Sequence, residues 1–240
     1  MAKKNRAAAS TSRVKLFYIL LGLVAVVGIG SLLYAVLGGR AGGAAVEPVA
    51  VAGTEDPRVL IQKAQGVSVG PKDAPVQVVV FSDFMCPYCG QFTLQVERLL
   101  KENYAQTGKI HYVYYDFPLG GAHRHSFLAA RAARCAGDQG KFWEYHDYLF
   151  GQQSEWSYER NPPVGQFEDY AEALGLDRAA FSECLRSDRH ADVVSANRLL
   201  GEQLGVNATP TVFVNGRRVE RPLDWPAFKA LIEGEAGAGA

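Results

Sequence analysis

The hydrophobic pattern of the chain is clearest in the stretch Val76–Gly90. It opens with a run of β-branched and aromatic residues that only Gln77 interrupts and that has no helical spacing, which predicts a strand buried on both faces in the middle of a sheet. After Cys89 the apolar residues recur at the spacing of a helix face, at Phe92, Val96, Leu99 and Leu100. The sequence Cys86-Pro87-Tyr88-Cys89 therefore lies where a central strand passes into a helix.

Further strands are expected on both sides of this one in the sequence. Gly66–Val69 is a short candidate, and Lys109–Phe117 has the composition of a second buried strand. Two strands that flank a helix in this way form a right-handed βαβ unit. Another strand begins at Thr211, and Asn215-Gly216 after it is a signal for a tight hairpin turn.

A long helical pattern separates the two groups of strands. It predicts five helices, over His125–Ala136, Lys141–Phe150, Phe167–Leu174, Arg178–Arg186 and Asp192–Leu204. These helices are expected to form an insertion over about residues 122–204. A last helix, Trp225–Ile232, has Asp224 as its N-cap and Pro226 just inside it. The sequence thus predicts an α/β domain over residues 66–233, followed by a disordered tail of Gly and Ala over 234–240.

The start of the chain has the pattern of a membrane anchor. Residues 16–37 are apolar or small and carry no charge, and at about 1.5 Å per residue they reach ~33 Å, enough for a hydrocarbon core of roughly 30 Å. This length favours an uncleaved transmembrane helix, although the small residues of Ala41–Ala45 leave cleavage open.

The charges around this apolar segment predict its orientation. The tail of residues 1–15 is basic and has no acid, whereas only Arg40 follows the apolar segment closely, so the N-terminus is expected in the cytoplasm and the domain outside the cell membrane. Residues 38–65, rich in Gly and Ala at first, are expected to be a flexible tether with a short helix at its end. The formal net charge of zero gives no basic field for nucleic acid.

Cys86 and Cys89 are the strongest candidates for chemistry. The pattern puts Cys86 at the N-cap of the helix and Pro87 at its first position, where the missing N–H of proline costs nothing. The free N–H groups and the positive dipole end of the helix stabilise a thiolate on Cys86. Cys86 is then the nucleophile, and Cys89, one turn further on, can form or break a disulfide with it. Pro87 and Tyr88 between them are expected to tune the site.

Other uses of the cysteine pair are half of a zinc site and a structural disulfide. The sequence has no second CxxC and no nearby CxxH to complete a metal site, and its spacing differs from the CxxxC of copper-binding proteins, so neither metal nor cofactor is expected. Strand, CxxC and helix together favour redox chemistry.

Two motifs together carry a family resemblance. They are SDFMCPYC and, far along the chain, GVNATPTVFVNG, in which Pro210 opens a strand as a candidate cis-proline. From about Val67 to Ile232 the chain resembles the DsbA family of thioredoxin-fold thiol–disulfide oxidoreductases, which also have an inserted helical cap. The resemblance implies that Thr209 and Pro210 lie against the CxxC and pair with the backbone of the substrate.

The resemblance also implies an activity and partners. It predicts an oxidoreductase that introduces disulfides into reduced exported proteins and is reoxidised by a membrane partner of the DsbB or VKOR type. Two alternatives stay open: a reductase or disulfide isomerase of the same fold, and a non-catalytic chaperone or binding module. Retention of both cysteines and of Thr209-Pro210 counts against the last, because binding alone needs no sulfur.

The other two cysteines, Cys135 and Cys184, fall on predicted helices of the cap. In an oxidising compartment, an even cysteine count with one pair assigned favours a structural disulfide between them, with two buried free thiols as the alternative.

One departure from the family pattern affects the proton of the buried thiol. The position six residues before the first cysteine, where several relatives have an acid, is Val80, and Asp83 is a doubtful substitute. His111, His146 and His190 are expected to be packing or surface residues, and the role of His123 is unassigned.

Overall fold

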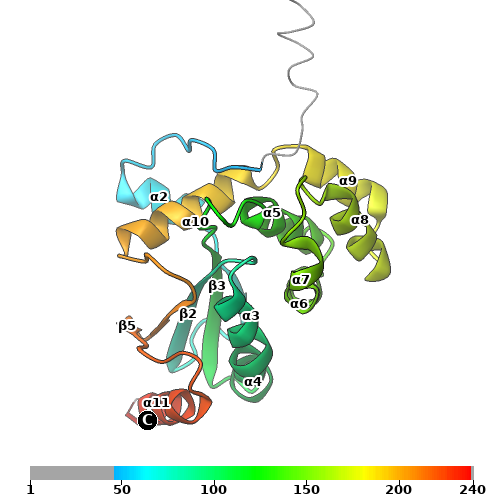
Figure 1. Cartoon of the computed structure of the whole chain (residues 1–240). Coiled ribbons are helices and arrows are strands. Elements are labelled where there is room, and N and C mark those ends of the chain that lie inside the picture. The colour runs from blue at the N-terminus through cyan, green and yellow to red at the C-terminus, as the bar shows by residue number, and fades with distance from the viewer. Residues whose placement is uncertain (1–45, 239–240) are drawn as a thin grey trace, which may run out of the picture. The chain divides into compact units, whose positions relative to one another are not determined.

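The computed structural model describes residues 46–238 of the chain (Figure 1). The predicted basic tail and transmembrane helix lie outside these residues. Within the described range, no helix combines the length and the apolar character that crossing a membrane requires. The described residues belong to one compact unit.

A mixed sheet forms the centre of this unit. Its strands are β1 (Val67–Val69), β2 (Val76–Ser82), β3 (Ile110–Asp116), β4 (Thr211–Val214) and β5 (Arg217–Arg218). They lie in the order β1-β3-β2-β4-β5, with β2 and β3 parallel and the other pairs antiparallel. The run of apolar residues in β2 therefore occupies the middle of the sheet, as a strand buried on both faces requires.

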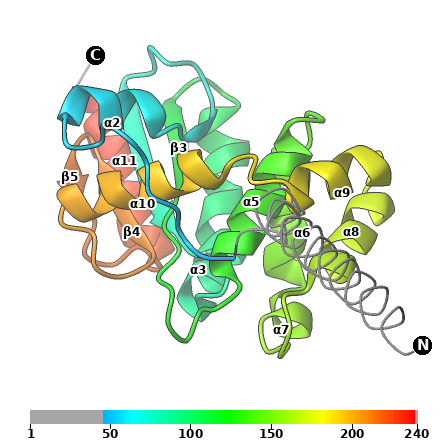
Figure 2. The same ribbon diagram turned by 90° about the horizontal axis from the view of Figure 1, so that it is seen from above.

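Helices cover both faces of the sheet. On one face, Val76, Val78 and Val80 of β2 pack beneath a helical stretch made of α3 (Pro87–Phe92), η1 (Thr93–Glu97), α4 (Arg98–Leu100) and η2 (Lys101–Ala105). On the other face, α10 (Ala191–Gln203) and α2 (Pro57–Lys63) lie side by side (Figures 1 and 2). A Cβ on Gly201 of α10 would come within 2.6 Å of the Phe117 ring, so the close approach of α10 to the sheet requires glycine.

The helical cap lies between β3 and β4 in the sequence. It consists of α5 (Ser126–Gly137), α6 (Phe142–Gly151), α7 (Gln153–Trp156), α8 (Val164–Ala173), α9 (Arg178–Arg186) and α10. The expected α/β fold with a helical insertion is confirmed. The short helix α7 is not among the helices that the sequence predicts, because four residues are too few to show a period.

A disulfide joins two helices of the cap. Cys135 of α5 and Cys184 of α9 have their sulfurs 2.00 Å apart, and both side chains are buried. The bridge adds to the packing of α5 against α9 at a sequence separation of 49 residues.

The segment before the domain departs from the expected flexible tether over residues 38–65. From Val46 onward it packs on the domain: Val51 is buried, and the Val49 N–H donates to Ser195 Oγ of α10 at 2.9 Å. Valines spaced along an extended segment bury apolar surface that the Gly and Ala content had hidden. Residues 38–45 lie outside the described range.

The end of the chain also departs from the expected disordered tail over residues 234–240. Helix α11 (Trp225–Ala238) continues past Glu233. Glu235 accepts a hydrogen bond from Asn215 Nδ2 and pairs with Arg217, both of which belong to the β4–β5 hairpin. These contacts stabilise a turn of helix that its Gly and Ala residues alone would not hold.

The Cys135–Cys184 bridge gives the first testable prediction. Closing a loop of this length is worth roughly 4 kcal/mol in the chain-entropy model. In the oxidised protein, the double variant Cys135→Ala, Cys184→Ala should therefore lose about that much free energy of unfolding, measured by urea denaturation. In a Cys86→Ser, Cys89→Ser variant purified without reductant, thiol labelling under denaturing conditions should find no free cysteine. Two labelled thiols would contradict the bridge.

Candidate active site

The sulfur of Cys86 lies at the N-terminus of α3. Cys86 is the N-cap residue with an extended backbone, and Pro87 follows at the first turn. The Cys86 side chain is 5% exposed, and its Sγ lies 3.3 Å from the carbonyl oxygen of Thr209. The local geometry follows from the sequence, because a proline after the cap residue starts a helix without losing a hydrogen bond.

The two cysteines of the pair differ in their electrostatics. The pKa of Cys86 is lowered to about 6, first by a hydrogen bond from the Cys89 thiol, then by the Thr209 side chain and the backbone N–H groups of Cys89 and Tyr88. Burial raises the pKa of Cys89, whose side chain is fully enclosed, and the neighbouring Cys86 raises it further. One sulfur is therefore a thiolate near neutral pH and the other holds its proton.

The loop before β4 contacts Cys86 on the side opposite α3. The Thr209–Pro210 peptide bond is cis, and β4 begins at the next residue. The pairing of Phe81 with Thr211 brings the end of β2 beside the start of β4. This register is what brings the sequence-predicted residues Cys86, Cys89, Thr209 and Pro210 to one edge of the sheet.

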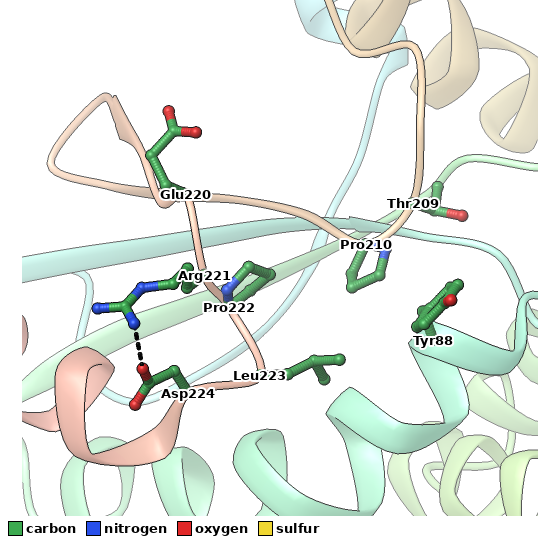
Figure 3. Close-up of a pocket in the computed structure, with 8 residues that line it drawn as sticks. All are labelled: Tyr88, Thr209, Pro210, Glu220, Arg221, Pro222, Leu223 and Asp224. Carbon is green, nitrogen blue, oxygen red and sulfur yellow. Dashed lines mark ion pairs between the residues drawn. The ribbon is translucent and has the colours of Figure 1, made fainter.

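A groove of about 560 Å³ opens beside these residues (Figure 3). Tyr88 and Pro210 face each other across it, and Tyr88 is 62% exposed. The full lining is Tyr88, Thr209, Pro210, Glu220, Arg221, Pro222, Leu223 and Asp224. Arg221 and Asp224 form an ion pair at 2.9 Å on the side away from Tyr88, so the wall formed by Tyr88, Pro210 and Leu223 is mainly apolar.

Asp83 holds the turn that precedes Cys86. Its Oδ1 accepts from the Met85 N–H at 2.7 Å, and its Oδ2 accepts from the Leu119 N–H at 2.8 Å and contacts His123 Nδ1 at 3.0 Å. Hydrogen bonding to Asp83 raises the pKa of His123, with a smaller contribution from the Cys86 charge. The carboxylate thus faces the loop after β3, and the Asp83 backbone N–H, not its carboxylate, contacts Cys89 Sγ at 3.5 Å.

The cap supplies a further contact that sequence reasoning missed. Gln153 of α7 donates from Nε2 to the carbonyl oxygens of Phe84 and Cys86, at 2.7 and 3.0 Å. A backbone N–H at His125 also donates to Met85 Sδ. Neither residue belongs to a motif, and only folding of the cap brings them to the turn.

One group of side chains within residues 46–238 has the composition of a metal site. The sulfurs of Cys135 and Cys184 lie within 4.8 Å of each other and of a ring nitrogen of His190. Both sulfurs are joined in the disulfide, so they have no thiolate to offer a metal. Cys135 and Cys184 belong to the cap and not to the redox pair.

Residues 62–234 match the family model described as thioredoxin. The chain belongs to the thioredoxin family. Its strand order, the CxxC at the start of α3 and the cis-proline opposite are the features of this thioredoxin-family domain that form the site.

Several solved structures of thiol–disulfide oxidoreductases within this family are similar to the chain. BdbD from Bacillus subtilis is 26% identical with a TM-score of 0.63, and the match covers 72% of this chain and 97% of BdbD. α-DsbA1 from Wolbachia pipientis is 22% identical with a TM-score of 0.65, covering 73% and 92%. DsbA from Chlamydia trachomatis is 20% identical with a TM-score of 0.61, covering 72% and 92%. These neighbours confirm the resemblance to the DsbA family.

The curated proteins that are similar in sequence to this domain are named as Na⁺/H⁺ antiporters. Na⁺/H⁺ antiporter NhaA 1 of Salinispora arenicola is 44% identical over 164 residues, which cover 68% of this chain and 24% of the relative. NhaA 1 of Mycolicibacterium gilvum is 36% identical over 174 residues, covering 71% and 26%. The chain thus spans about a quarter of the length of the curated relatives that it matches.

The opposed pKa values of the pair predict a titration. In the reduced protein, the ultraviolet absorbance of the thiolate should appear with a midpoint of about 6 and vanish in Cys86→Ala. Because the Cys89 thiol is the main cause of the lowered pKa, Cys89→Ala should raise the midpoint toward the ordinary 9.0, whereas Cys89→Ser, which keeps a donor, should raise it less.

The same shift predicts how the stability of the reduced fold depends on pH. Folding lowers the pKa of Cys86, so the contribution of Cys86 to stability is full above pH 9.0 and is lost as the pH falls through about 6. Folding raises the pKa of Cys89, so the contribution of Cys89 is full below pH 9.0 and is lost as the pH rises above it. In the thiolate titration, a midpoint near 9.0 for the wild-type protein would show that the pKa of Cys86 is not lowered.

Proposed function

We propose that the chain is an extracytoplasmic thiol–disulfide oxidoreductase that introduces disulfides into exported proteins through the Cys86–Cys89 pair. The observation that carries this proposal is the sulfur of Cys86, held as a thiolate at the start of α3. A stabilised thiolate favours the dithiol over the disulfide, so the disulfide accepts electrons readily.

The reaction transfers two electrons from the client to the pair. A client thiolate attacks Sγ of Cys86, the Cys86–Cys89 bond breaks, and Cys89 leaves with the electron pair and takes up a proton. A second client thiolate then attacks the client sulfur of the mixed disulfide, and Cys86 leaves as a thiolate. The client gains a disulfide, and the reduced pair passes its electrons to a membrane partner of the DsbB or VKOR type.

The groove beside Cys86 fits an extended client segment. The Thr209 carbonyl is already directed to the Cys86 sulfur, and the backbone of Thr209 and Pro210 borders the groove. The apolar surfaces of Tyr88, Pro210 and Leu223 would contact neighbouring client side chains without selecting a charge. Such a surface suits an enzyme that acts on many sequences.

Other functions have less support. A reductase or isomerase would use the same residues but needs a supply of electrons, and a low Cys86 pKa favours the opposite direction. A chaperone or binding module would need neither sulfur. The antiporter activity named for the curated relatives is not carried over, because the chain spans only about a quarter of their length.

The direction of the reaction can be tested through the redox potential. The full chain in detergent, equilibrated with glutathione buffers, should have a potential clearly more oxidising than the roughly −270 mV of thioredoxin. The oxidised protein should also form a disulfide in a reduced two-cysteine peptide, and Cys86→Ser should abolish this. A potential near −270 mV would favour the reductase instead.

The proposed location has its own test. The basic residues of positions 1–15, with only Arg40 close behind the apolar segment, support a location of the domain outside a single membrane span. Protease added to intact spheroplasts should therefore degrade or release the domain. Protection of the domain until the membrane is lysed would reverse the topology and remove the oxidising compartment.

A further inference from the structure

The proton of Cys89 needs a route that the structure does not provide in the expected places. Cys89 is fully buried, and the strand position before it that could hold an acid is the buried, apolar Val80. The carboxylate of Asp83 is already bonded to Met85, Leu119 and His123. Some other group must exchange this proton, because opening the disulfide leaves a buried sulfur whose neutral form is favoured.

A row of buried polar side chains begins beside Cys89. Ser82 ends β2 next to the turn, and its hydroxyl lies near enough to the Cys89 sulfur and the Tyr114 hydroxyl to lower the pKa of each, without a close hydrogen bond to either. Tyr114 and Tyr112 alternate along β3, so their side chains lie on the same face of the sheet. Both phenols are completely enclosed by the core.

The row continues into the helices above the sheet. Glu97 of η1 is 1% exposed, and its Oε2 accepts from Thr93 at 2.8 Å. Its carboxylate raises the pKa of the nearby Tyr112 hydroxyl, and its Oε1 lies 3.7 Å from both Lys101 Nζ and His146 Nε2. A separation of 3.7 Å is wider than a direct hydrogen bond, so both contacts are electrostatic.

His146 connects Glu97 to the surface. Its Nδ1 lies 2.8 Å from Asp147 Oδ1, and its other nitrogen faces Glu97. The Asp147 side chain is 49% exposed, and Lys101 bonds to it at 2.9 Å. We call the following set the buried relay: Ser82, Tyr114, Tyr112, Glu97, His146 and Asp147.

The state of these atoms argues against a purely structural role. Five of them are enclosed yet have no close hydrogen-bond partner among the residues that the structure describes: Ser82 Oγ, Tyr114 OH, Tyr112 OH, Glu97 Oε1 and His146 Nε2. A polar cluster that only fixed the packing would pair its atoms, since unpaired buried groups are destabilising. Of the nine buried side-chain atoms without a partner among the described residues, these five belong to side chains that lead from Ser82, beside Cys89, to His146, which bonds to Asp147.

We propose that the buried relay carries the proton that Cys89 gains when its disulfide opens and loses when the disulfide re-forms. The carboxylate of Glu97 is the buried group that accepts this proton within the relay. This inference rests on the proposed function of the Cys86–Cys89 pair. Glu97 and the other members act through one another, so they are positioning residues for proton transfer and not catalytic residues.

The chemistry balances in both directions. When a thiolate attacks Cys86, Cys89 leaves as a thiolate and receives a proton from the relay, which is replaced from water at Asp147. When the mixed disulfide on Cys86 resolves inward, the Cys89 thiol gives its proton to the relay as its sulfur attacks Cys86. The partner's sulfur then leaves as a thiolate.

Several other titratable and charged groups face Cys89 or the relay and set the background for its pH dependence. They are Cys86, Lys101 and, beyond Tyr114, Asp116 with its partner Arg134. Of these, only Cys86 contacts Cys89, and it titrates in a separate, earlier range.

The experiment follows each cysteine separately. The reduced full chain in detergent is mixed with oxidised glutathione: Cys86 attacks first, and Cys89 then attacks the Cys86–glutathione disulfide and releases glutathione. Acid quenching and mass spectrometry resolve the two steps. Glu97→Gln should slow the second step about 10²-fold near neutral pH and leave the first unchanged. The difference should shrink as pH rises, because hydroxide then removes the Cys89 proton directly.

Two more variants make the result decisive. Tyr114→Phe removes only a hydroxyl from the row and should slow the second step with the same pH dependence. Glu168→Gln, an isosteric change at another buried glutamate on α8 of the cap, should match the wild type in both steps. If Glu97→Gln does not fold, Tyr114→Phe decides.

The outcomes separate this inference from the function beneath it. Wild-type rates and pH profiles for the second step in folded Glu97→Gln and Tyr114→Phe would overturn the relay and leave the oxidoreductase standing. A wild-type protein that forms no Cys86–glutathione disulfide would overturn the proposed function and the relay together.

Discussion

The site depends on one constraint: the sulfur of Cys86 is held between the N-terminus of α3 and the carbonyl of Thr209. This arrangement follows from the order of the sheet. Because β2 and β4 are neighbours and Phe81 pairs with Thr211, the segment that leaves β2 and the segment that enters β4 meet at the same edge. The strand pairing, formed by buried valines far from any chemistry, is what places the two segments within contact of each other.

The inserted cap also stabilises the turn that carries Cys86. Gln153 donates to two carbonyl oxygens of the turn that carries Cys86, and Asp83 ties the same turn to the loop after β3. The turn is therefore held from both sides by hydrogen bonds to its backbone, next to the Tyr88 side chain that lines the groove. Rigid support of this kind is how a loop keeps a reactive group in a fixed geometry.

Local signals in the sequence were enough to predict the elements that carry the site. The buried run of β2, the Cys86-Pro87 helix start, the proline before β4 and the Asn215-Gly216 turn each depend on neighbouring residues, and the fold that they imply is the one found. The sequence did not predict contacts between residues that lie far apart along the chain. Gln153 has no local signature, and the extension of α11 depends on Glu235 meeting the β4–β5 hairpin. The Gly and Ala content predicted flexible segments over residues 38–65 and 234–240, because composition carries no information on contacts with distant residues.

The burial of Cys89 has consequences in two directions. Enclosing this thiol keeps its proton in place, and the protonated thiol is the largest single stabiliser of the Cys86 thiolate through its hydrogen bond. The same enclosure removes Cys89 from water, so each opening or closing of the disulfide must move a proton through the core. A site that gains a reactive outer sulfur by burying the inner one therefore needs polar groups inside the fold. The core beneath Cys89 has them, where Tyr112 and Tyr114 of β3 and Glu97 of η1 occupy positions that packing alone would fill with apolar side chains.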